Sequence, residues 1–329
     1  MAMTFVPHAR RGVLAVLAAA AATVVAGPAS ALDFPRRTVR IVVPYAPGGS
    51  AELQARAVGE QLSKIWKQPV IIENRPGAGT TIGAATVASA PADGYTLYLA
   101  GTSHTVSPSL YRNLSYDAAK SFAAVSQIST SPFIVLVNPK LGVKTIEDLI
   151  ALAKRKPGEL NYGTSGVGAG PHLSAEILAF DTKINVRHVP FKGSAPAVTA
   201  LLGQHVDFVL GDVSALPLVE DGSLKALAVT GLHRSARLPD VPTLAESVAP
   251  GFEVTNWSSI LAPAATPAEI VSFINKSMAD ALVVPEVRRA YDIQGFEVAP
   301  NRPEEMQAKI ISEARKYADV IARAGIKND

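Results

Sequence analysis

The chain has 329 residues and no cysteine, and it carries 31 Lys and Arg against 28 Asp and Glu. Without cysteine it can have no disulfide, thiolate metal site, cysteine nucleophile or lipoprotein-type lipid anchor. Two of the basic residues lie in a predicted leader, so 29 basic and 28 acidic residues remain in the rest of the chain. A balance so close to neutral predicts no nucleic-acid partner.

The first 31 residues have the pattern of a secretory signal peptide. Arg10 and Arg11 precede an apolar run from Gly12 to Ala26, and residues 29–31 read A-S-A, a cleavage signal. The run is too short and too close to this signal to predict a membrane span. We therefore expect export, cleavage near Ala31 and a mature chain of roughly 298 residues. The arginine pair supports the twin-arginine route only weakly, so the general secretory route is favoured.

The mature chain alternates between strand and helix patterns, which is typical of an α/β fold. Its first part predicts strands at residues 39–43, 70–73 and 95–100 and helices at 51–66 and 81–90. After an apolar run at 133–137, the second part predicts helices at 146–156, 172–180 and 195–202 and strands at 160–163, 186–189, 207–210 and 224–230. Two further helical stripes run from Ile270 to Leu282 and from Met306 to Ile321.

The two series predict two α/β domains with the final helices packed on the first. We expect the chain to cross near Ser131 and to return near Gly231, so that residues 32–131 plus 231–329 form domain 1 and 132–230 form domain 2. Two crossings make a hinge, and the crevice between two such domains is a natural ligand site.

The segment from Tyr45 to Glu52, YAPGGSAE, is the strongest candidate for a ligand loop. It joins the strand at 39–43 to the next helix, and its Pro-Gly-Gly suits a tight turn. Ser50 is expected to be the N-cap of that helix. The unpaired N–H groups and the positive dipole of a helix start favour a small anion, although turns of this kind also occur without any ligand.

Two more glycine-rich turns lead from a strand into a helix. One is NRPGAGTTIG at residues 74–83, and the other is GTSGVGAGPHLSAE at residues 163–176. Glycines in such turns let a ligand approach the backbone closely. Three loops of this kind at the carboxyl ends of strands predict a carboxylate held by amides and hydroxyls.

Several ordered motifs resemble the substrate-binding proteins of tripartite tricarboxylate transporters, also called the Bug family. They cover nearly the whole mature chain and include PYAPGGSAE, VIIENRPGAGTTIG, ADGYTLYLAG, NYGTSGVGAGPHLSAE, VPFKGSAPAVTALLGQHVDF, RLPDVPTLAES and ILAPAATP. The resemblance implies a two-lobed, type II-like periplasmic binding fold. It also implies capture of a small organic carboxylate in the periplasm and its delivery to the membrane subunits of such a transporter.

Matching the family motifs position by position assigns the expected ligand-binding residues. They are Tyr45, Pro47, Gly48, Gly49, Ser50 and Glu52 in the first loop, Thr80 and Thr81 in the second, Ser165, Gly166, Val167 and Gly168 in the third, and Ser103 and Asp212 after two strands. Three residues depart from the family pattern. Glu52 replaces a usual aspartate, Ala169 a common serine and Ser107 a usual asparagine, which leaves the identity of the ligand open.

Other polar side chains have an ordinary structural interpretation beside a ligand role. Arg75 is expected to bond neighbouring carbonyls, Lys192 to be solvated and His172 to pack or cap its helix. Trp257 is expected to lie in the core or between the domains rather than to stack on a ligand.

Enzyme motifs are not supported, and we expect no cofactor or metal. Residues 163–166 lack the final glycine of G-x-S-x-G, the histidines form no H-x-x-x-H pair, and no phosphate-loop motif occurs. The alternative is a secreted hydrolase with Ser50 or Ser165 as nucleophile and Glu52 or His172 as base. A third hypothesis is a ligand-loaded sensor that contacts the ectodomain of a signalling kinase instead of a transporter. In each case we expect the protein to be a monomer.

Overall fold

The computed structural model describes residues 1–4, 33–45, 47–111 and 113–327. The predicted signal peptide lies outside the described residues except for its first four. The chain divides between Met1–Phe34 and Pro35–Asp329, and the fold below is that of the second unit.

A six-stranded mixed sheet forms the first lobe, in the order β11-β4-β10-β3-β1-β2. Its strands are β1 (Val39–Val43), β2 (Val70–Asn74), β3 (Thr96–Gly101), β4 (Phe122–Pro132), β10 (Thr255–Pro263) and β11 (Glu297–Val298). β1 pairs in parallel with β2 and β3, as the alternating pattern predicts. β10 runs antiparallel to both β3 and β4, so the sheet is not purely parallel.

A five-stranded sheet forms the second lobe, in the order β7-β6-β8-β5-β9. Its strands are β5 (Ile134–Val137), β6 (Asn161–Thr164), β7 (Arg187–Pro190), β8 (Phe208–Gly211) and β9 (Lys225–Val229). β6 is parallel to β7 and β8, whereas β5 is antiparallel to β8 and β9. Each lobe is thus an α/β layer built on its own mixed sheet.

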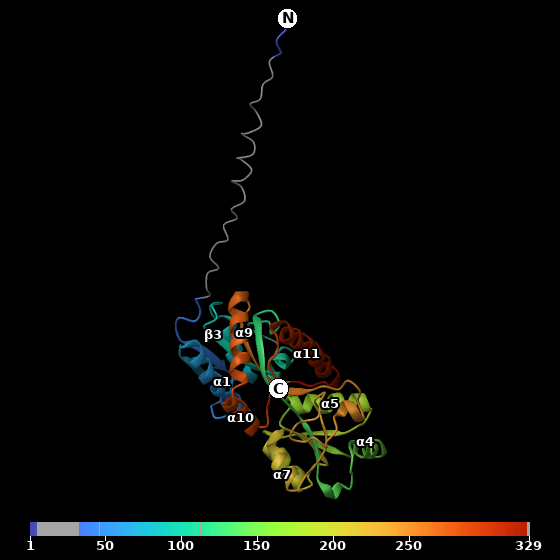
Figure 1. Cartoon of the computed structure of the whole chain (residues 1–329). Coiled ribbons are helices and arrows are strands. Elements are labelled where there is room, and N and C mark those ends of the chain that lie inside the picture. The colour runs from blue at the N-terminus through green and yellow to red at the C-terminus, as the bar shows by residue number, and fades with distance from the viewer. Residues whose placement is uncertain (5–32, 46, 112, 328–329) are drawn as a thin grey trace. The chain divides into compact units, whose positions relative to one another are not determined.

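The helices of the first lobe surround its sheet (Figure 1). They are α1 (Ser50–Trp66), the short 3-10 turn η1 (Ala78–Thr80), α2 (Thr81–Ala88), α3 (Thr102–Leu110), α9 (Ala268–Leu282), α10 (Pro285–Ile293) and α11 (Pro303–Ala324). In α1, Ala55, Val58, Leu62 and Trp66 are buried, which is the apolar stripe expected of a helix packed on a sheet. No helix in the described part of the chain is long and apolar enough to span a bilayer.

The second lobe has helices of its own. They are the 3-10 turn η2 (Pro139–Leu141), α4 (Ile146–Arg155), α5 (Gly170–Thr182), α6 (Ser194–Leu202), the 3-10 turn η3 (Val213–Ala215), α7 (Leu216–Glu220) and α8 (Leu244–Ser247). A capping box between Thr145 and Asp148 fixes the start of α4.

Thr230 joins the two chain segments that connect the lobes. Its N–H donates to the carbonyl of Phe133 at 3.0 Å, and the N–H of Phe133 donates to its hydroxyl at 2.8 Å. The same hydroxyl donates to the carbonyl of Val254 at 2.6 Å. Phe133 lies between β4 and β5, and Val254 precedes β10, so one residue ties together both crossings.

The segment between β9 and β10 stays close to the second lobe. Thr243 bridges to Val229 of β9, and Leu244 and Phe252 belong to a buried cluster that includes Leu149 of α4. The domain boundaries at 131 and 231 remain a proposal, and these contacts favour a return nearer Val254.

The C-terminal helix α11 contacts both lobes. It packs on β4 and α3 of the first lobe and on α5 of the second. Its buried Tyr317, Val320 and Ile321 complete a cluster formed largely by second-lobe residues. α11 therefore packs on the first lobe and contacts the second lobe as well.

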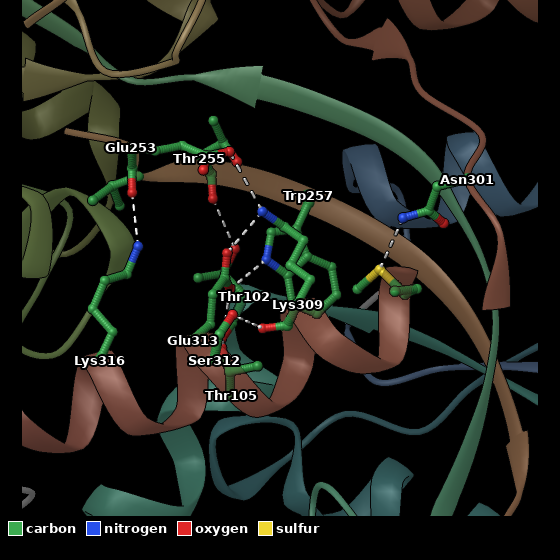
Figure 2. Close-up of polar contacts among 12 residues, drawn as sticks. Thr102, Thr105, Glu253, Thr255, Trp257, Asn301, Lys309, Ser312, Glu313 and Lys316 are labelled. Carbon is green, nitrogen blue, oxygen red and sulfur yellow. Dashed lines mark hydrogen bonds and ion pairs between the residues drawn. The ribbon is translucent and has the colours of Figure 1, made fainter. Parts of the chain in front are cut away.

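Figure 2 shows how α11 holds the second crossing. Glu313 accepts from the indole Nε1 of Trp257 at 2.8 Å and from Nζ of Lys309 at 2.9 Å. Lys316 donates to the carbonyl of Glu253 at 2.7 Å. Trp257 is fully buried, as expected for a core residue.

Candidate functional site

The first predicted loop ends at the N-terminus of α1. The N-cap is Gly49, one residue before the predicted Ser50, and no side chain caps the helix. The first backbone bond of the helix runs from the N–H of Leu53 to the carbonyl of Gly49. Ser50 and Ala51 therefore present N–H groups that the helix itself leaves unpaired. This is the anion-binding geometry that the loop pattern predicts.

Glu52 folds back onto the loop. Its carboxylate accepts the N–H of Gly48 at 2.5 Å and Nε of Arg56 at 2.8 Å. The Gly48 N–H, followed by the Arg56 guanidinium, lowers the pKa of this carboxyl below its usual range. Gly48 takes a φ of +87°, which suits glycine. The Gly48 amide is thus already bonded within the loop, and Glu52 fixes the turn.

Three predicted residues form a hydroxyl chain beside this loop. The hydroxyls of Tyr45 and Ser103 are 2.9 Å apart, and the Thr80 hydroxyl donates to Ser103 at 3.3 Å. The desolvation of Tyr45 raises the pKa of its phenol, so the phenol stays a neutral hydrogen-bonding group. Thr81 bonds instead to the carbonyl of Ala78 within its own turn.

The second-lobe loop from Ser165 to Gly168 is closed in the same manner as the first. The N–H of Gly168 donates to Nδ1 of His172 at 3.0 Å, and Gly168 has a φ of +72°. In both loops, therefore, a glycine with positive φ donates its backbone N–H to the side chain of the residue four positions later. Val167 is exposed, and Gly168 lies against Leu110 of α3.

His172 belongs to a buried group behind this loop. Its ring stacks on His188 with centroids 3.8 Å apart, and His188 Nε2 lies 2.6 Å from the Thr164 hydroxyl. Burial, with His188 adding to it, lowers the pKa of His172 to about 3, and burial lowers that of His188 to about 4. A neutral His172 can accept the Gly168 N–H, and its buried, stacked ring has the packing role that was predicted.

Asp212 caps the turn η3 after β8. Its carboxylate accepts the N–H of Ser214 at 3.0 Å and the hydroxyls of Ser194 and Ser214, both at 2.5 Å. Both carboxylate oxygens are therefore engaged, yet the residue still borders a cavity. Arg75 pairs with Glu73, in line with a local structural role.

Two cavities adjoin the N-terminus of α1. The first, which we call the junction cavity, has about 400 Å³ and is lined from both lobes, by residues that include Ser50, Ser131, Asp212, Ser214, Arg237, Asn256, Gln294 and Phe296. The second, the α1 cavity, has about 300 Å³ and is lined by Tyr45, Gly49, Ser50, Ala51, Gln54, Gly101, Asn256, Trp257, Ser258 and Phe296. Ser50, Asn256 and Phe296 line both, so the two cavities adjoin.

These cavities bring some predicted residues together and leave others apart. Ser50 and Asp212 line the junction cavity, and Tyr45, Gly49 and Ser50 line the α1 cavity. The loop Ser165–Gly168 lines neither of the two cavities. The ligand roles of all these predicted residues remain predictions.

Several lining residues were not predicted. Gln54 lies one turn inside a helix, and Gln294 and Phe296 lie far along the chain, outside the quoted motifs. Arg237, in RLPDVPTLAES, and Asn256, next to Trp257, lie in segments that the resemblance covers, but neither was assigned a ligand role.

The geometry gives no support to the hydrolase alternative. The hydrogen bonds of Glu52 go to Gly48 and Arg56, and that of His172 Nδ1 goes to Gly168. Each proposed base is thus engaged with its own loop rather than with Ser50 or Ser165.

Comparisons with known proteins agree with this architecture. A family model described as the tripartite tricarboxylate transporter family receptor matches residues 54–326. Protein BugT of Bordetella pertussis is 34% identical over 309 residues, which cover 92% of this chain and 94% of BugT.

Two solved structures are similar over most of their length. Rpa4515 of R. palustris with adipate has 35% identity and a TM-score of 0.73, with 90% of this chain and 99% of the other covered. MatC of Rhodopseudomonas palustris with bound malate has 32% identity and a TM-score of 0.69, with 88% and 100% covered. This chain belongs to the tripartite tricarboxylate transporter family receptors, the TctC or Bug family of two-lobed binding proteins.

Proposed function

We propose that this protein is a periplasmic solute-binding protein that captures a small organic carboxylate between its lobes. The supporting observation is that Ser50, at the open N-terminus of α1, and Asp212, in the second lobe, line one junction cavity. The backbone N–H groups at the start of α1 supply hydrogen-bond donors for a carboxylate, so binding does not require an arginine to pair with it. Adipate and malate in related structures fit the same ligand class.

Capture proceeds by closure of the two lobes about the crossings at Phe133 and Val254. A ligand that contacts both lobes stabilises the closed form over the open one, because only the closed form offers both sets of contacts. The loaded form then delivers the acid to the membrane subunits of a tripartite tricarboxylate transporter, and the receptor acts as a monomer without catalysis. Export across the inner membrane depends on the predicted leader at residues 1–31.

Isothermal calorimetry with the mature protein tests capture. The panel contains succinate, malate, glutarate, adipate, citrate and benzoate, with the corresponding neutral amides as controls. We expect at least one acid to bind and its amide not to bind. Absence of binding by every acid would overturn the proposal, and small-angle scattering with and without the bound acid tests closure.

A pull-down from membrane extract distinguishes the possible partners. Transporter subunits retained only by the loaded receptor support delivery, whereas retention of a kinase ectodomain supports the signalling alternative. Both partners would contact the same closed surface, so the ligand is included in each arm.

A further inference from the structure

The α1 cavity contains an unusual buried side chain, Gln54. Gln54 is 1% exposed, and its side-chain Oε1 accepts a hydrogen bond from the hydroxyl of Ser129 at 2.6 Å. Its Nε2 has no hydrogen-bond partner among the residues that the structure describes. A buried donor without an acceptor costs free energy, so it needs a guest or another reason to persist.

The neighbours of Gln54 hold it in place. The Tyr291 hydroxyl donates to the backbone carbonyl of Gln54 at 3.3 Å, and Tyr291 is itself fully buried. Ser129 of β4 fixes one end of the side-chain amide. The unpaired Nε2 is therefore a preorganised donor on a residue that lines the cavity.

Gln54 lies one helical turn after Ser50. Residues four apart share a helix face, and helical side chains lean toward the N-terminus. Both residues line the α1 cavity, next to the unpaired N–H groups of the first turn. A carboxylate at the helix start would thus have a second donor close beside it.

The chemistry of the cavity decides what this second donor binds. The described side chains that line it are all uncharged. A second carboxylate placed there would be desolvated without a compensating cation, which is costly. A hydroxyl or carbonyl oxygen needs no cation and accepts from a neutral amide. The adjoining junction cavity, where Arg237 lies, leaves room for the distal end of the ligand.

We infer that Gln54 is a specificity-determining residue that selects carboxylates with an oxygen on the neighbouring carbon, namely 2-hydroxy or 2-oxo acids. This inference rests on the proposed function and narrows its ligand class. The carboxylate lies at the first turn of α1, and Gln54 Nε2 donates to the oxygen at position 2.

Calorimetry with paired acids tests the inference. The pairs are succinate with each enantiomer of malate, and glutarate with 2-hydroxyglutarate and 2-oxoglutarate. Wild-type protein should bind the oxygenated member of a pair about tenfold more tightly, the value of roughly one hydrogen bond. Gln54→Met keeps the volume and removes the donor. It should erase this preference and leave the affinity for the unsubstituted acid within about twofold.

Ser129→Ala is the companion variant, because it removes the partner of Oε1 and leaves Nε2 intact. We expect it to reduce the preference only in part, since the amide keeps its donor and loses the bond that fixes it. An equal loss for both members of each pair in Gln54→Met would assign Gln54 a structural role only and overturn the inference. Wild-type binding without preference would also overturn it, while leaving the proposed function standing. Failure of every acid to bind wild-type protein would overturn both.

The NMR signals of the Gln54 side-chain amide provide a second readout in the wild-type protein. Once assigned by backbone connectivity, its ¹H and ¹⁵N chemical shifts should change on addition of malate or 2-oxoglutarate. The shift with succinate or glutarate should be much smaller. Equal shifts in both titrations would contradict a contact at position 2.

Discussion

Glu313 of α11 accepts the indole N–H of Trp257 in β10 at 2.8 Å, and both residues are almost completely buried. The same carboxylate forms an ion pair with Lys309, and the Thr105 hydroxyl lies 3.5 Å from Oε2 of Glu313. The C-terminal helix is thus bonded to the strand that leaves the second crossing (Figure 2).

Glu313→Ala should destabilise the protein by about 3 kcal/mol, because it leaves the Trp257 N–H and the Lys309 ammonium without their buried partner. Glu313→Gln keeps an acceptor for the indole and should cost less. Urea unfolding of both variants measures the difference. Equal stability of Glu313→Ala and wild type would show that the network contributes nothing.

Glu52→Ala should weaken carboxylate binding by roughly three- to tenfold, because the Gly48 turn loses the side chain that fixes it. The change also releases Arg56. Glu52→Gln keeps an acceptor for the Gly48 N–H and should retain more affinity. Calorimetry with the tightest acid of the panel decides. Tighter binding by Glu52→Ala would instead mean that the freed Gly48 amide contacts the ligand.

Gly168→Ala should destabilise the protein for two reasons. Its φ of +72° disfavours any side chain, and a Cβ there would lie 2.7 Å from Cδ1 of Leu110. Gly142→Ala is the control, since Gly142 has a φ of +78° with open space around its Cβ position. We expect backbone strain to lower the free energy of unfolding by about 1 kcal/mol at each site, and the contact with Leu110 to lower it further at Gly168. Equal losses would show that Leu110 moves aside without cost.

Acid should destabilise the fold through its buried histidines. Burial lowers the pKa of His104 from 6.5 to about 4, and that of His172 falls to about 3. Below pH 6.5 the unfolded chain binds protons that the folded chain does not, so stability is full above this pH and is lost as the pH falls. Each of these two histidines costs up to about 1.4 kcal/mol per pH unit in that range.

His104→Phe should reduce the stability difference between pH 7 and pH 5 by about 2 kcal/mol. His104 packs among Tyr98, Tyr116 and Phe122, so an aromatic ring suits the site. Urea unfolding at pH 7 and at pH 5 measures this difference in stability. His205→Gln is the control, because His205 is exposed. An unchanged pH dependence in His104→Phe would show that His104 does not take up a proton on unfolding.

The sequence predicts the regular elements best where local pattern and tertiary burial agree. Residues 39–43 form a buried β-branched run, and the structure has β1 with the same bounds. α3 was not predicted, because T-S-H-T-V-S-P-S-L contains Pro108 and lacks an apolar stripe, and the helix is fixed by packing against α11. The antiparallel pairing of β10 with β3 and β4 was also missed, since it depends on where the chain returns.

The candidate site was predictable only in part for a related reason. Glycine and proline mark the loop at residues 47–50 in the sequence itself, so its place at a helix start could be foreseen. Gln54 has no such mark. Its importance arises from burial against Ser129 and from a cavity that forms only when β10 and Phe296 lie beside α1.

α11 supplies groups that both lobes need in order to bury their apolar surface. A chain truncated before Pro303 has no Glu313 for the indole of Trp257 and no Tyr317 or Ile321 for the buried cluster. Both lobes therefore keep exposed apolar surface until α11 docks. A receptor without this helix is thus open to unfolding and aggregation, although the strands of both sheets are already present.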